Sequence, residues 1–385
     1  MREVAIIGIG QTRIDEQWDK SLKDLAGEAV MAALKDAGLT GADAIFVGNM
    51  MSGPANNQQH LGASIADWVG LRYVDAMHIE AACSSGAAAF RSALMAVASG
   101  EMDTAIAVGV EKMTDIPGEE ITAQLATAAD ADWEADTGLS FVALNALIMR
   151  RYMHEFGWKK DDFAGFSINA HANGAHNPFA RFQEAITIED YRRAGPICEP
   201  INLMDASGIG DGSAAAILVP ADAVRGRGLP VIRVAGSGAA TDTLAVQNRR
   251  EPLWLKAAER SVKQAYSQAG IGPADINIFE AHDAFSIMAA LSLEACGFAD
   301  KGQAPRLANE GAIVPTGKIP VATRGGLKAR GHPVGATGMY QIVEVVQQLR
   351  GEAFGTQVPN ARIGMAQNIG GSGSNIITHI LKRED

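Results

Sequence analysis

Short apolar runs alternate along the chain with longer segments whose apolar residues recur at helical spacing. Residues 4–9 form one such run, and residues 44–47 and 104–109 form two more. Between the first two runs, apolar residues three and four positions apart mark one face of a helix over residues 22–34, and Gly38 follows as a stop signal. Strands and helices of these lengths in alternation predict an α/β fold.

The pattern repeats in the second half of the chain. After a shift of 232 positions, seven residues of the first helical segment and its following turn meet identical residues. The pairs are Ala26 and Ala258, Val30 and Val262, Ala33 and Ala265, Ala37 and Ala269, Gly38 and Gly270, Ala42 and Ala274, and Asp43 and Asp275. The repeat predicts two copies of one mixed α/β unit, packed about a pseudo-twofold axis. Each copy begins a helix at a distinctive turn, at Cys83 and at His332, and the axis would bring these two helix starts together.

The division of the chain follows from this repeat. We assign residues 1–114 and 201–235 to an N-terminal half and residues 236–385 to a C-terminal half. Residues 115–200 are irregular and rich in alanine, aspartate and aromatic residues. We expect them to form an inserted, mostly helical cap that covers the substrate.

Cys83 lies in a turn of small residues, 80–89, that runs directly into a helical pattern. A thiol at the start of a helix faces unpaired backbone N–H groups and the positive end of the helix dipole, and both favour the thiolate. The alternative is that Cys83 is a small buried apolar residue, the usual environment of a free cysteine. The candidate chemistry elsewhere in the chain favours the first interpretation.

Three further segments carry that chemistry. His282 follows the expected strand 276–280, and residues at the carboxyl ends of strands line the clefts of α/β sheets. His332 stands in a glycine-rich loop, 325–338, that leads into a helix. Residues 368–375 follow the expected strand 362–366 and are suited to donate backbone N–H groups to an oxyanion. Each segment has a structural alternative. His282 would be a histidine of the core, His332 would be a turn residue that makes a local hydrogen bond, and residues 368–375 would be only a tight loop.

A cysteine with two histidines is the minimum set for covalent acyl transfer. The thiolate attacks a thioester or ketone carbonyl, one histidine takes the thiol proton, and the other binds the oxyanion together with backbone N–H groups. A sulfur nucleophile suits a thioester substrate, because the acyl group then passes between groups of similar leaving ability.

Charge and hydropathy exclude several classes of partner. The net charge is −11 and no long basic run is present, so we expect no nucleic-acid partner. A phosphate-bearing substrate then needs local basic residues, for which residues 249–250 and 324–330 are candidates. No apolar run reaches membrane-spanning length, and residues 1–8 begin a strand rather than a signal peptide, so we expect no membrane association. Three cysteines without metal-ligand spacing fit a reducing compartment, and we expect a cytoplasmic protein with no bound metal.

Two glycine-rich segments test a dinucleotide-binding alternative. Residues 8–13 follow a strand but lack the third glycine of the phosphate-binding fingerprint. Residues 208–213 precede the expected strand 214–219, where the fingerprint needs a helix. Both segments fail, and we set this alternative aside.

The chain resembles the thiolase superfamily over nearly its full length. Four motifs carry the resemblance, in the order that the family has them: Cys-Ser-Ser-Gly at 83–86, His-Asp-x-Phe at 282–285, Gly-His-Pro-x-Gly-x-Thr-Gly at 331–338 and Gly-Gly-x-Gly at 370–373. Many thiolases carry Asn-Glu-x-Phe at the second motif, and the form found here is similar to the sterol-carrier-protein-like and archaeal-type acetyl-CoA acetyltransferase branch. The resemblance implies a duplicated five-layer α/β/α/β/α architecture with a central cap insertion.

The resemblance also implies roles for individual residues. Cys83 would be the acyl-accepting nucleophile and His332 the base that activates it. His282 would lie in the hole that binds the thioester oxygen of the acetyl-CoA that forms the enolate. The backbone N–H groups of Cys83 and Gly370 would form a second oxyanion hole. The family needs no cofactor besides the coenzyme A thioester, which is its substrate.

One departure from the family concerns the acid/base that acts on the substrate α-carbon. Many thiolases have a second cysteine where Asn368 stands, and sterol-carrier-type thiolases have one where Ala284 stands. Neither position carries a thiol in this chain, so the α-carbon proton must go to His282, to His332 or to a water that they hold. Cys296 lies on a helical stripe and is expected in the core, and Cys198 is expected to be structural.

Three functions compete on this sequence. The preferred one is a thiolase that makes or cleaves a 3-oxoacyl-CoA, with acetoacetyl-CoA formed from two acetyl-CoA as the preferred case. The second is a thiolase-fold aldolase that acts on a CoA thioester without an acyl-enzyme, and the third is a non-catalytic assembly partner. The resemblance implies a homodimer or homotetramer, and it implies as further partners a small zinc-ribbon/OB-fold protein and a hydroxymethylglutaryl-CoA synthase.

Overall fold

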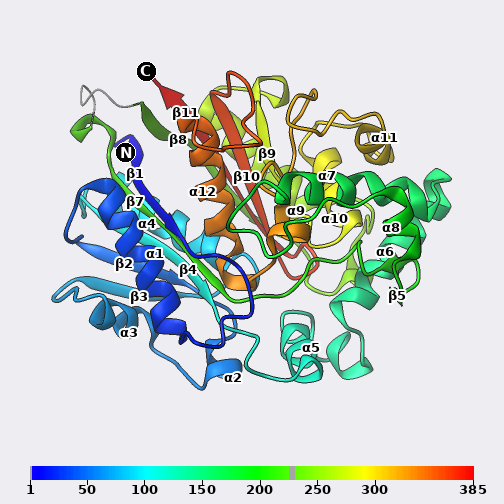
Figure 1. The fold of residues 1–385 in the computed structure, drawn as a ribbon, viewed down its shortest axis with the longest axis horizontal. Helices are drawn as coiled ribbons and strands as arrows, with labels where there is room; N and C mark the ends of the chain where they lie inside the picture. The colour runs from blue at the N-terminus through cyan, green and yellow to red at the C-terminus, as the bar shows by residue number, and fades with distance from the viewer. Residues whose placement is uncertain (1, 225–229) are drawn as a thin grey trace.

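A computed structural model describes residues 2–224 and 230–385 (Figure 1). Within these residues, nine strands form one mixed sheet in the order β3-β2-β4-β7-β1-β8-β11-β10-β9. The strands are β1 (Val4–Gln11), β2 (Ala44–Gly48), β3 (Asp75–Ile79), β4 (Ala105–Glu111), β7 (Gly212–Pro220), β8 (Val231–Thr241), β9 (Ile278–Glu280), β10 (Ile363–Gly370) and β11 (Asn375–Glu384). The expected α/β alternation is confirmed, and the expected strands lie at or within a few residues of these bounds.

The sheet consists of two copies of one strand pattern. The order β2-β4-β7-β1 in the N-terminal copy corresponds to β9-β10-β11-β8 in the C-terminal copy. The strand directions also correspond, because β2–β4 and β9–β10 are parallel while the other neighbours within each copy are antiparallel. The copies join where β1 pairs with β8, over Ala5 with Arg233 and Ile6 with Ile232. The repeat in the sequence is therefore a repeat in the structure.

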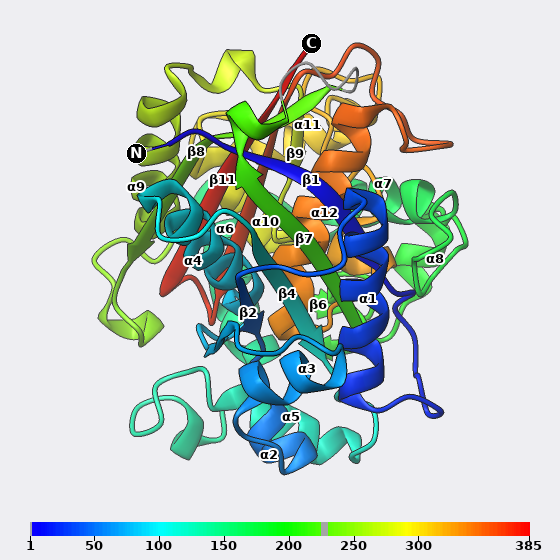
Figure 2. The same cartoon turned by 90° about the vertical axis from the view of Figure 1, so that its left-hand side faces the viewer.

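Helices cover both faces of each copy. α1 (Leu22–Ala37) packs on β1 and β7, and α9 (Lys256–Ala269) packs on β8 and β11. α4 (Ser85–Ser99) and α12 (Thr337–Arg350) contact each other between the two copies, α4 against β2 and β4 and α12 against β10, β11 and β7. Figure 1 shows α12 between the blue strands of the first copy and the red strands of the second, and Figure 2 looks onto the outer helices α1 and α3 (Leu61–Trp68). The expected five layers are present, and the two sheet layers are continuous through β1 and β8.

Glycines let the outer helices lie close to the sheet in both copies. A Cβ atom on Gly8 of β1 would lie 2.2 Å from the carbonyl oxygen of Ala33 in α1. A Cβ atom on Gly236 of β8 would lie 2.3 Å from the carbonyl oxygen of Ala265 in α9. Ala33 and Ala265 are one of the repeated pairs, so the close approach is itself repeated. Gly8 thus serves helix packing, in agreement with the rejection of a dinucleotide site there.

The two central helices meet at their first turns. A Cβ atom on Gly86, the second residue of α4, would lie 2.8 Å from the carbonyl oxygen of Gly335. A Cβ atom on Gly338, the second residue of α12, would lie 2.4 Å from the backbone nitrogen of Ala87. Such distances leave room for hydrogen only. The expected meeting of the two helix starts is confirmed, and it depends on this pair of glycines.

The segment 115–200 is mostly helical, as expected. Its α-helices are α5 (Gly118–Ala126), α6 (Phe141–Phe156), α7 (Ala164–Gly174) and α8 (Ile188–Arg193), with β5 (Pro196–Cys198) paired to β6 (Ile201–Asn202) at its end. The remaining α-helices of the described residues are α2 (Ser52–Asn56), α10 (Ser286–Ala295) and α11 (Ala304–Asn309). The division into 1–114 with 201–235, 115–200 and 236–385 stays a prediction, and its first part includes Met1 and residues 225–229, which lie outside the described residues.

Candidate active site

One cavity of about 220 Å³ brings together the three side chains that the sequence singles out. Cys83, His282 and His332 all line it. Cys83 comes two residues before α4, His282 comes two residues after β9, and His332 comes five residues before α12. Because α4 and α12 meet at their first turns, the turn of the first copy and the loop of the second copy face the same space.

The cap supplies much of the cavity wall. α5 and the N-terminal part of α6 contribute apolar and small polar side chains, and α10 and β10 contribute two more apolar ones. These side chains are Ile121, Thr122, Leu125, Phe141, Val142, Asn145, Met288 and Ile369. The segment 115–200 therefore lines the space in front of Cys83, which fits the expectation that it covers the substrate.

The turn that carries Cys83 is held by short local hydrogen bonds. Ala82 adopts a left-handed backbone conformation, with φ of +52°, which is uncommon for a residue with a Cβ atom. The hydroxyls of Ser84 and Ser85 donate to the carbonyl oxygens of Ala81 and Ala82, each at 2.6 Å. These bonds fix the backbone on both sides of the sulfur, so the thiol has a defined position before any substrate arrives.

The helix start favours the thiolate of Cys83, but burial acts in the opposite direction. Burial raises the pKa of Cys83 to about 12, and the nearby carboxyl of Glu111 raises it further. The backbone N–H groups of Gly371 and of Cys83 itself lower this pKa, but burial outweighs them. The low dielectric of the closed site, which the local sequence does not reveal, therefore outweighs the helix start. Cys83 rests as a neutral thiol and needs a base.

His332 is suited to be that base. Its Nδ1 lies 2.6 Å from the hydroxyl oxygen of Thr337, and that hydroxyl donates to the carbonyl oxygen of Pro333 at 3.1 Å. The hydroxyl proton is thus committed, so the Thr337 oxygen accepts a hydrogen bond from Nδ1–H. Burial, assisted by the positive charge of Arg330, lowers the pKa of His332 to about 3. His332 is therefore neutral near pH 7, with a free electron pair on Nε2.

His282 lies beside His332 with its ring edge-on. The two ring centroids are 5.1 Å apart and the ring planes meet at 86°. The Nδ1 atom of His282 lies 2.9 Å from the amide nitrogen of Asn368 in β10. Burial lowers the pKa of His282 well below its usual value, and the positive charge of Arg330 acts in the same direction. Both histidines are neutral side chains in a closed pocket.

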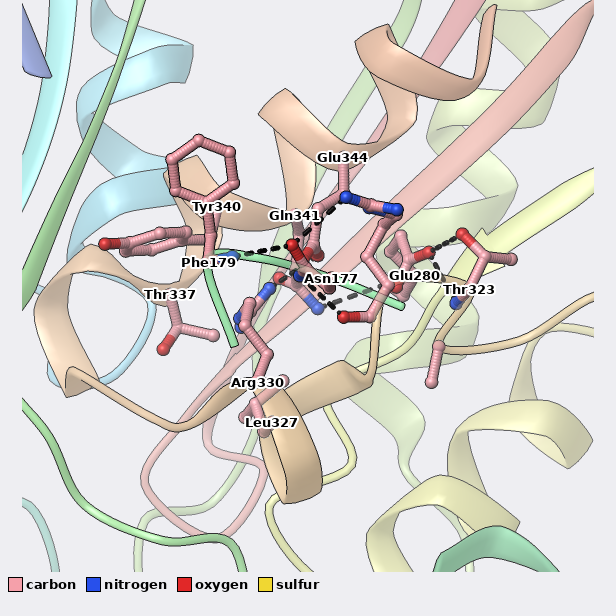
Figure 3. Close-up of polar contacts among 12 residues, drawn as sticks. Asn177, Phe179, Glu280, Thr323, Leu327, Arg330, Thr337, Tyr340, Gln341 and Glu344 are labelled. Atoms are coloured by element: carbon pink, nitrogen blue, oxygen red, sulfur yellow. Dashed lines mark hydrogen bonds and ion pairs between the residues drawn. The ribbon is translucent and has the colours of Figure 1, made fainter. Parts of the chain in front are cut away.

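A buried charge cluster is centred on Arg330 (Figure 3). Arg330 is fully buried, and its Nη1 donates to the Glu344 carboxylate of α12 at 2.5 Å. Glu280, at the end of β9, accepts from the backbone and the hydroxyl of Thr323 at 2.9 and 2.6 Å. Figure 3 shows Arg330 and Glu344 turned toward each other, with Glu280 beside them. The cluster places a positive charge close enough to both imidazoles to lower their pKa values.

This cluster also corrects the expectation that residues 324–330 bind a phosphate. Arg324, Lys328 and Arg330 are almost entirely buried and bond to groups inside the protein. Arg249 is buried as well, with Nη1 donating to the carbonyl oxygen of Ser372, whereas Arg250 is exposed. Of the basic residues that we considered, only Arg250 presents its side chain to the solvent.

Glu111 connects the two copies of the fold beside the cavity. This buried carboxylate at the end of β4 accepts from the backbone N–H of Gly335 at 2.8 Å, and from Asn49, Met50 and Met51 at 2.7 to 3.1 Å. Burial raises its pKa to about 7, against the effect of these hydrogen bonds. Because Gly335 belongs to the loop of His332, Glu111 holds the base-bearing loop of the second copy against the first.

The other candidate residues from the sequence lie in or next to the cavity. Gly371 lines the cavity, and Gly370 lies next to it, packed against the carbonyl oxygen of Ala81. The role of Gly370 in an oxyanion hole stays a prediction. Ala284 lines the cavity without a thiol, and Asn368 is buried against His282.

The other two cysteines lie away from Cys83. Cys296 is buried in the core beside Gln367, as expected, and Cys198 is partly buried in β5 and packs against the same core. In the part of the chain that the structure describes, no group of histidine, cysteine or acidic residues could hold a metal ion. No helix among those residues is long and apolar enough to cross a membrane.

Three functional residues were missed by the sequence reasoning. Thr337 was quoted within the glycine-rich loop, but only the structure shows that it fixes the orientation of His332. Glu111 and Glu344 were not singled out, because their bonding partners, Gly335 and Arg330, are recognisable only in the structure. A charged residue inside an otherwise apolar strand or helix face is the feature that could have identified both.

Comparison with known proteins agrees with this geometry. The family model for the thiolase N-terminal domain matches residues 4–222, and the model for the thiolase C-terminal domain-like family matches residues 238–383. The acetyl-CoA acetyltransferase of Methanothermobacter thermautotrophicus is 44% identical over 385 residues, which is the whole of both chains. The acetyl-CoA acetyltransferase of Methanocaldococcus jannaschii is 36% identical over 99% of each chain.

A solved structure, the Ltp2-ChsH2(DUF35) aldolase, superposes with a TM-score of 0.86 at 25% identity, covering 99% of this chain and 97% of that one. The fold alone is thus compatible with aldolase and thiolase relatives. The two relatives that match over 99% or more of both chains, however, are acetyl-CoA acetyltransferases, and both halves of the chain match thiolase models. The chain belongs to the thiolase family and is an acyltransferase of the thiolase type.

Proposed function

We propose that this enzyme joins two molecules of acetyl-CoA into acetoacetyl-CoA, and catalyses the reverse cleavage, through an acetyl group carried on Cys83. The observation that supports this most strongly is the shared cavity. It holds a neutral thiol, Cys83, and a neutral imidazole, His332, whose Nδ1 is occupied and whose Nε2 is free to accept a proton.

In the first half-reaction, His332 Nε2 takes the proton of the Cys83 thiol as the sulfur attacks the acetyl-CoA carbonyl carbon. The S–C bond to Cys83 forms, the S–C bond to coenzyme A breaks, and the coenzyme A sulfur leaves with the proton from His332. The backbone N–H groups of Cys83 and Gly371 near the sulfur are suited to bind the oxyanion that forms in between. His332 ends this step neutral.

In the second half-reaction, a histidine removes a proton from the α-carbon of a second acetyl-CoA. The resulting carbanion attacks the acetyl carbonyl on Cys83, a C–C bond forms, and the Cys83 sulfur leaves and is protonated again. Every bond change is supplied by the two thioesters and the protein. We therefore propose that no cofactor is needed and that coenzyme A enters only as part of the substrate.

An aldolase function has one observation in its favour, the similarity to the Ltp2-ChsH2(DUF35) aldolase. Carbon–carbon cleavage by an aldolase needs no nucleophilic thiol, whereas here Cys83 lies in the cavity beside a base. We therefore rank the aldolase second and a non-catalytic partner third. That neighbour carries two protein names, which supports the proposal that this chain also assembles with a small zinc-ribbon/OB-fold protein.

We further propose that the chain forms a homodimer or homotetramer, and that a hydroxymethylglutaryl-CoA synthase is a second partner. The cytoplasm is the proposed location, because Cys83 must stay a free thiol to accept an acyl group, and the three cysteines are unpaired in the structure. The molar mass of the purified protein, measured by light scattering with and without the partners, tests the assembly.

A cleavage assay tests the catalytic proposal. With acetoacetyl-CoA and coenzyme A as substrates, the wild type should turn over. Cys83→Ala should fall to background, and His332→Ala should lose about 10²- to 10⁴-fold, the usual contribution of a general base. Cys198→Ala and the exposed His154→Ala are matched controls that should keep full activity. Full activity in Cys83→Ala would overturn the assignment of the nucleophile.

A further inference from the structure

We propose that Asn368 is a positioning residue that keeps the proton of His282 on Nε2, so that His282 acts only as a hydrogen-bond donor and His332 is the base in both half-reactions. The inference deepens the proposed function and rests on it. It assigns a role to the residue that stands where many relatives have a second catalytic thiol.

The contact between Asn368 and His282 determines which nitrogen of the His282 ring carries the proton. An amide nitrogen donates hydrogen bonds and cannot accept them. The amide nitrogen of Asn368 lies 2.9 Å from Nδ1 of His282, so Nδ1 must accept with its electron pair. A neutral imidazole carries one proton, which then sits on Nε2. His282 is buried and, among the described residues, no carboxylate bonds to its ring, so nothing nearby stabilises a second proton.

The amide of Asn368 makes its polar contact through the nitrogen. Among the described residues, its buried oxygen accepts no hydrogen bond. The NH₂ group facing Nδ1 of His282 is therefore the contact on which the position of the His282 proton rests.

His332 has the opposite polarity. Its Nδ1 donates to Thr337 and its Nε2 carries an electron pair, as the hydrogen bonds of that hydroxyl require. The cavity thus contains one imidazole that offers a proton and one that accepts a proton. The two are not interchangeable, because different neighbours fix each of them.

The proton positions on the two histidines indicate which of them removes the α-carbon proton, the step that a second cysteine would otherwise perform. The α-carbon proton of the second acetyl-CoA passes to His332 Nε2, since the C–H electron pair moves toward the thioester carbonyl and its oxygen becomes an enolate. His282 Nε2–H donates to that oxygen. When the new C–C bond has formed, the Cys83 sulfur leaves and takes the proton back from His332. His332 can act twice, because coenzyme A carried away its first proton.

The test uses variants of Asn368 and separates the two half-reactions. Asp has the size of Asn but its carboxylate only accepts, so Asn368→Asp should draw the proton of His282 to Nδ1 and remove the donor from the cavity. Asn368→Ala should leave the tautomer unfixed. Exchange of the α-hydrogens of acetyl-CoA with deuterated water reports enolate formation, and intact mass reports acetylation of Cys83. Asn309→Asp, at an exposed asparagine, is the matched control.

We expect Asn368→Asp to lose about 10²- to 10³-fold in α-hydrogen exchange, the usual effect of losing one oxyanion donor, and to keep the rate of acetylation within about threefold. Equal loss of both rates would indicate a structural role and would overturn the proposal. So would exchange at the wild-type rate. If the wild type is not acetylated, the proposed function itself fails, which is a different outcome.

A second measurement reads the tautomer directly. In protein labelled with ¹⁵N-histidine, the nitrogen shifts distinguish a protonated ring nitrogen from an unprotonated one, and His282→Gln identifies the His282 signals. The wild type should show the proton on Nε2, and Asn368→Asp should show it on Nδ1. A wild-type proton on Nδ1 would overturn the proposal whatever the activities are.

Discussion

The two central helices occupy equivalent positions in the two copies of the fold, yet they bury different side chains. α4, which follows Cys83, packs its inner face with Ala89, Phe90, Ala93 and Val97. α12, which follows His332, buries Gln341, Glu344 and Gln348 as well as apolar residues. The backbone frame is repeated, down to the glycine in the second position of each helix, but of these two helices only α12 buries a charged side chain, Glu344.

The difference follows from what each copy contributes to the site. In the first copy, the thiol of Cys83 is kept neutral by burial and by the nearby carboxyl of Glu111, both of which raise its pKa. A base must stay unprotonated, and the second copy achieves this chiefly by burying both imidazoles, with the positive charge of Arg330 lowering their pKa values further. A buried cation needs a partner, and Glu344 on α12 supplies it.

Of the variants that test this difference between the two copies, the largest effect on stability is expected from removing the charge of Glu344. Glu344→Gln keeps the size of the side chain but leaves Arg330 buried without its ion-pair partner. We expect the free energy of unfolding to fall by about 3–5 kcal/mol, the usual result of breaking a buried pair. Urea denaturation measures it, with Glu155→Gln as the control, because Glu155 pairs with Arg151 on the surface. A change as small as that of the control would show that the cluster is not needed for folding.

A smaller effect is expected where the two helices touch. Gly338→Ala places a methyl group 2.4 Å from the backbone of α4, which cannot move away like a flexible side chain. We expect a loss of about 1–3 kcal/mol in the free energy of unfolding, together with reduced activity, because Cys83 and His332 are positioned from this contact. Gly118→Ala is the control, since its Cβ would meet nothing within 4 Å. Equal stability of the two variants would contradict the close contact.

The smallest effect is expected when the pH is lowered and the rate of Cys83 acetylation is measured. His332 has a pKa of about 3, so the proton-accepting form is complete above roughly pH 5 and is lost only as the pH falls toward that value. Glu111 has a pKa of about 7, so it loses its negative charge as the pH falls from about 7 to about 5. The loss of this charge removes one of the causes that raise the pKa of Cys83. The single-turnover rate of Cys83 acetylation should therefore not fall between pH 7 and pH 5. A tenfold fall per pH unit below 6.5 would show an ordinary histidine instead.

Much of the fold could be predicted from the sequence because its signals are local. Residues 22–34 show helical spacing and Gly38 ends the helix, and the repeat at Gly270 ends its counterpart in the same left-handed conformation. The four motifs identified the family and the residues that line the cavity. These signals can be recognised from residues that are close in sequence, or from the repeat after a shift of 232 positions.

The rest depends on contacts between distant residues. The pKa of Cys83 is set by burial under the cap and by Glu111, neither of which the turn at 80–89 reveals. Residues 324–330 read as a surface basic segment, but Arg330 is fully buried beside Glu344. Asn368 reads as a lost thiol until the structure brings it to His282, 86 positions away.

The most direct measurement is the intact mass of the protein after brief mixing with acetyl-CoA, for the wild type beside Cys83→Ala. The wild type should gain the mass of one acetyl group, and free coenzyme A should remove it, while the variant should gain nothing. A wild type that binds coenzyme A but never gains the acetyl group would contradict covalent catalysis at Cys83 and would favour the aldolase or the non-catalytic partner.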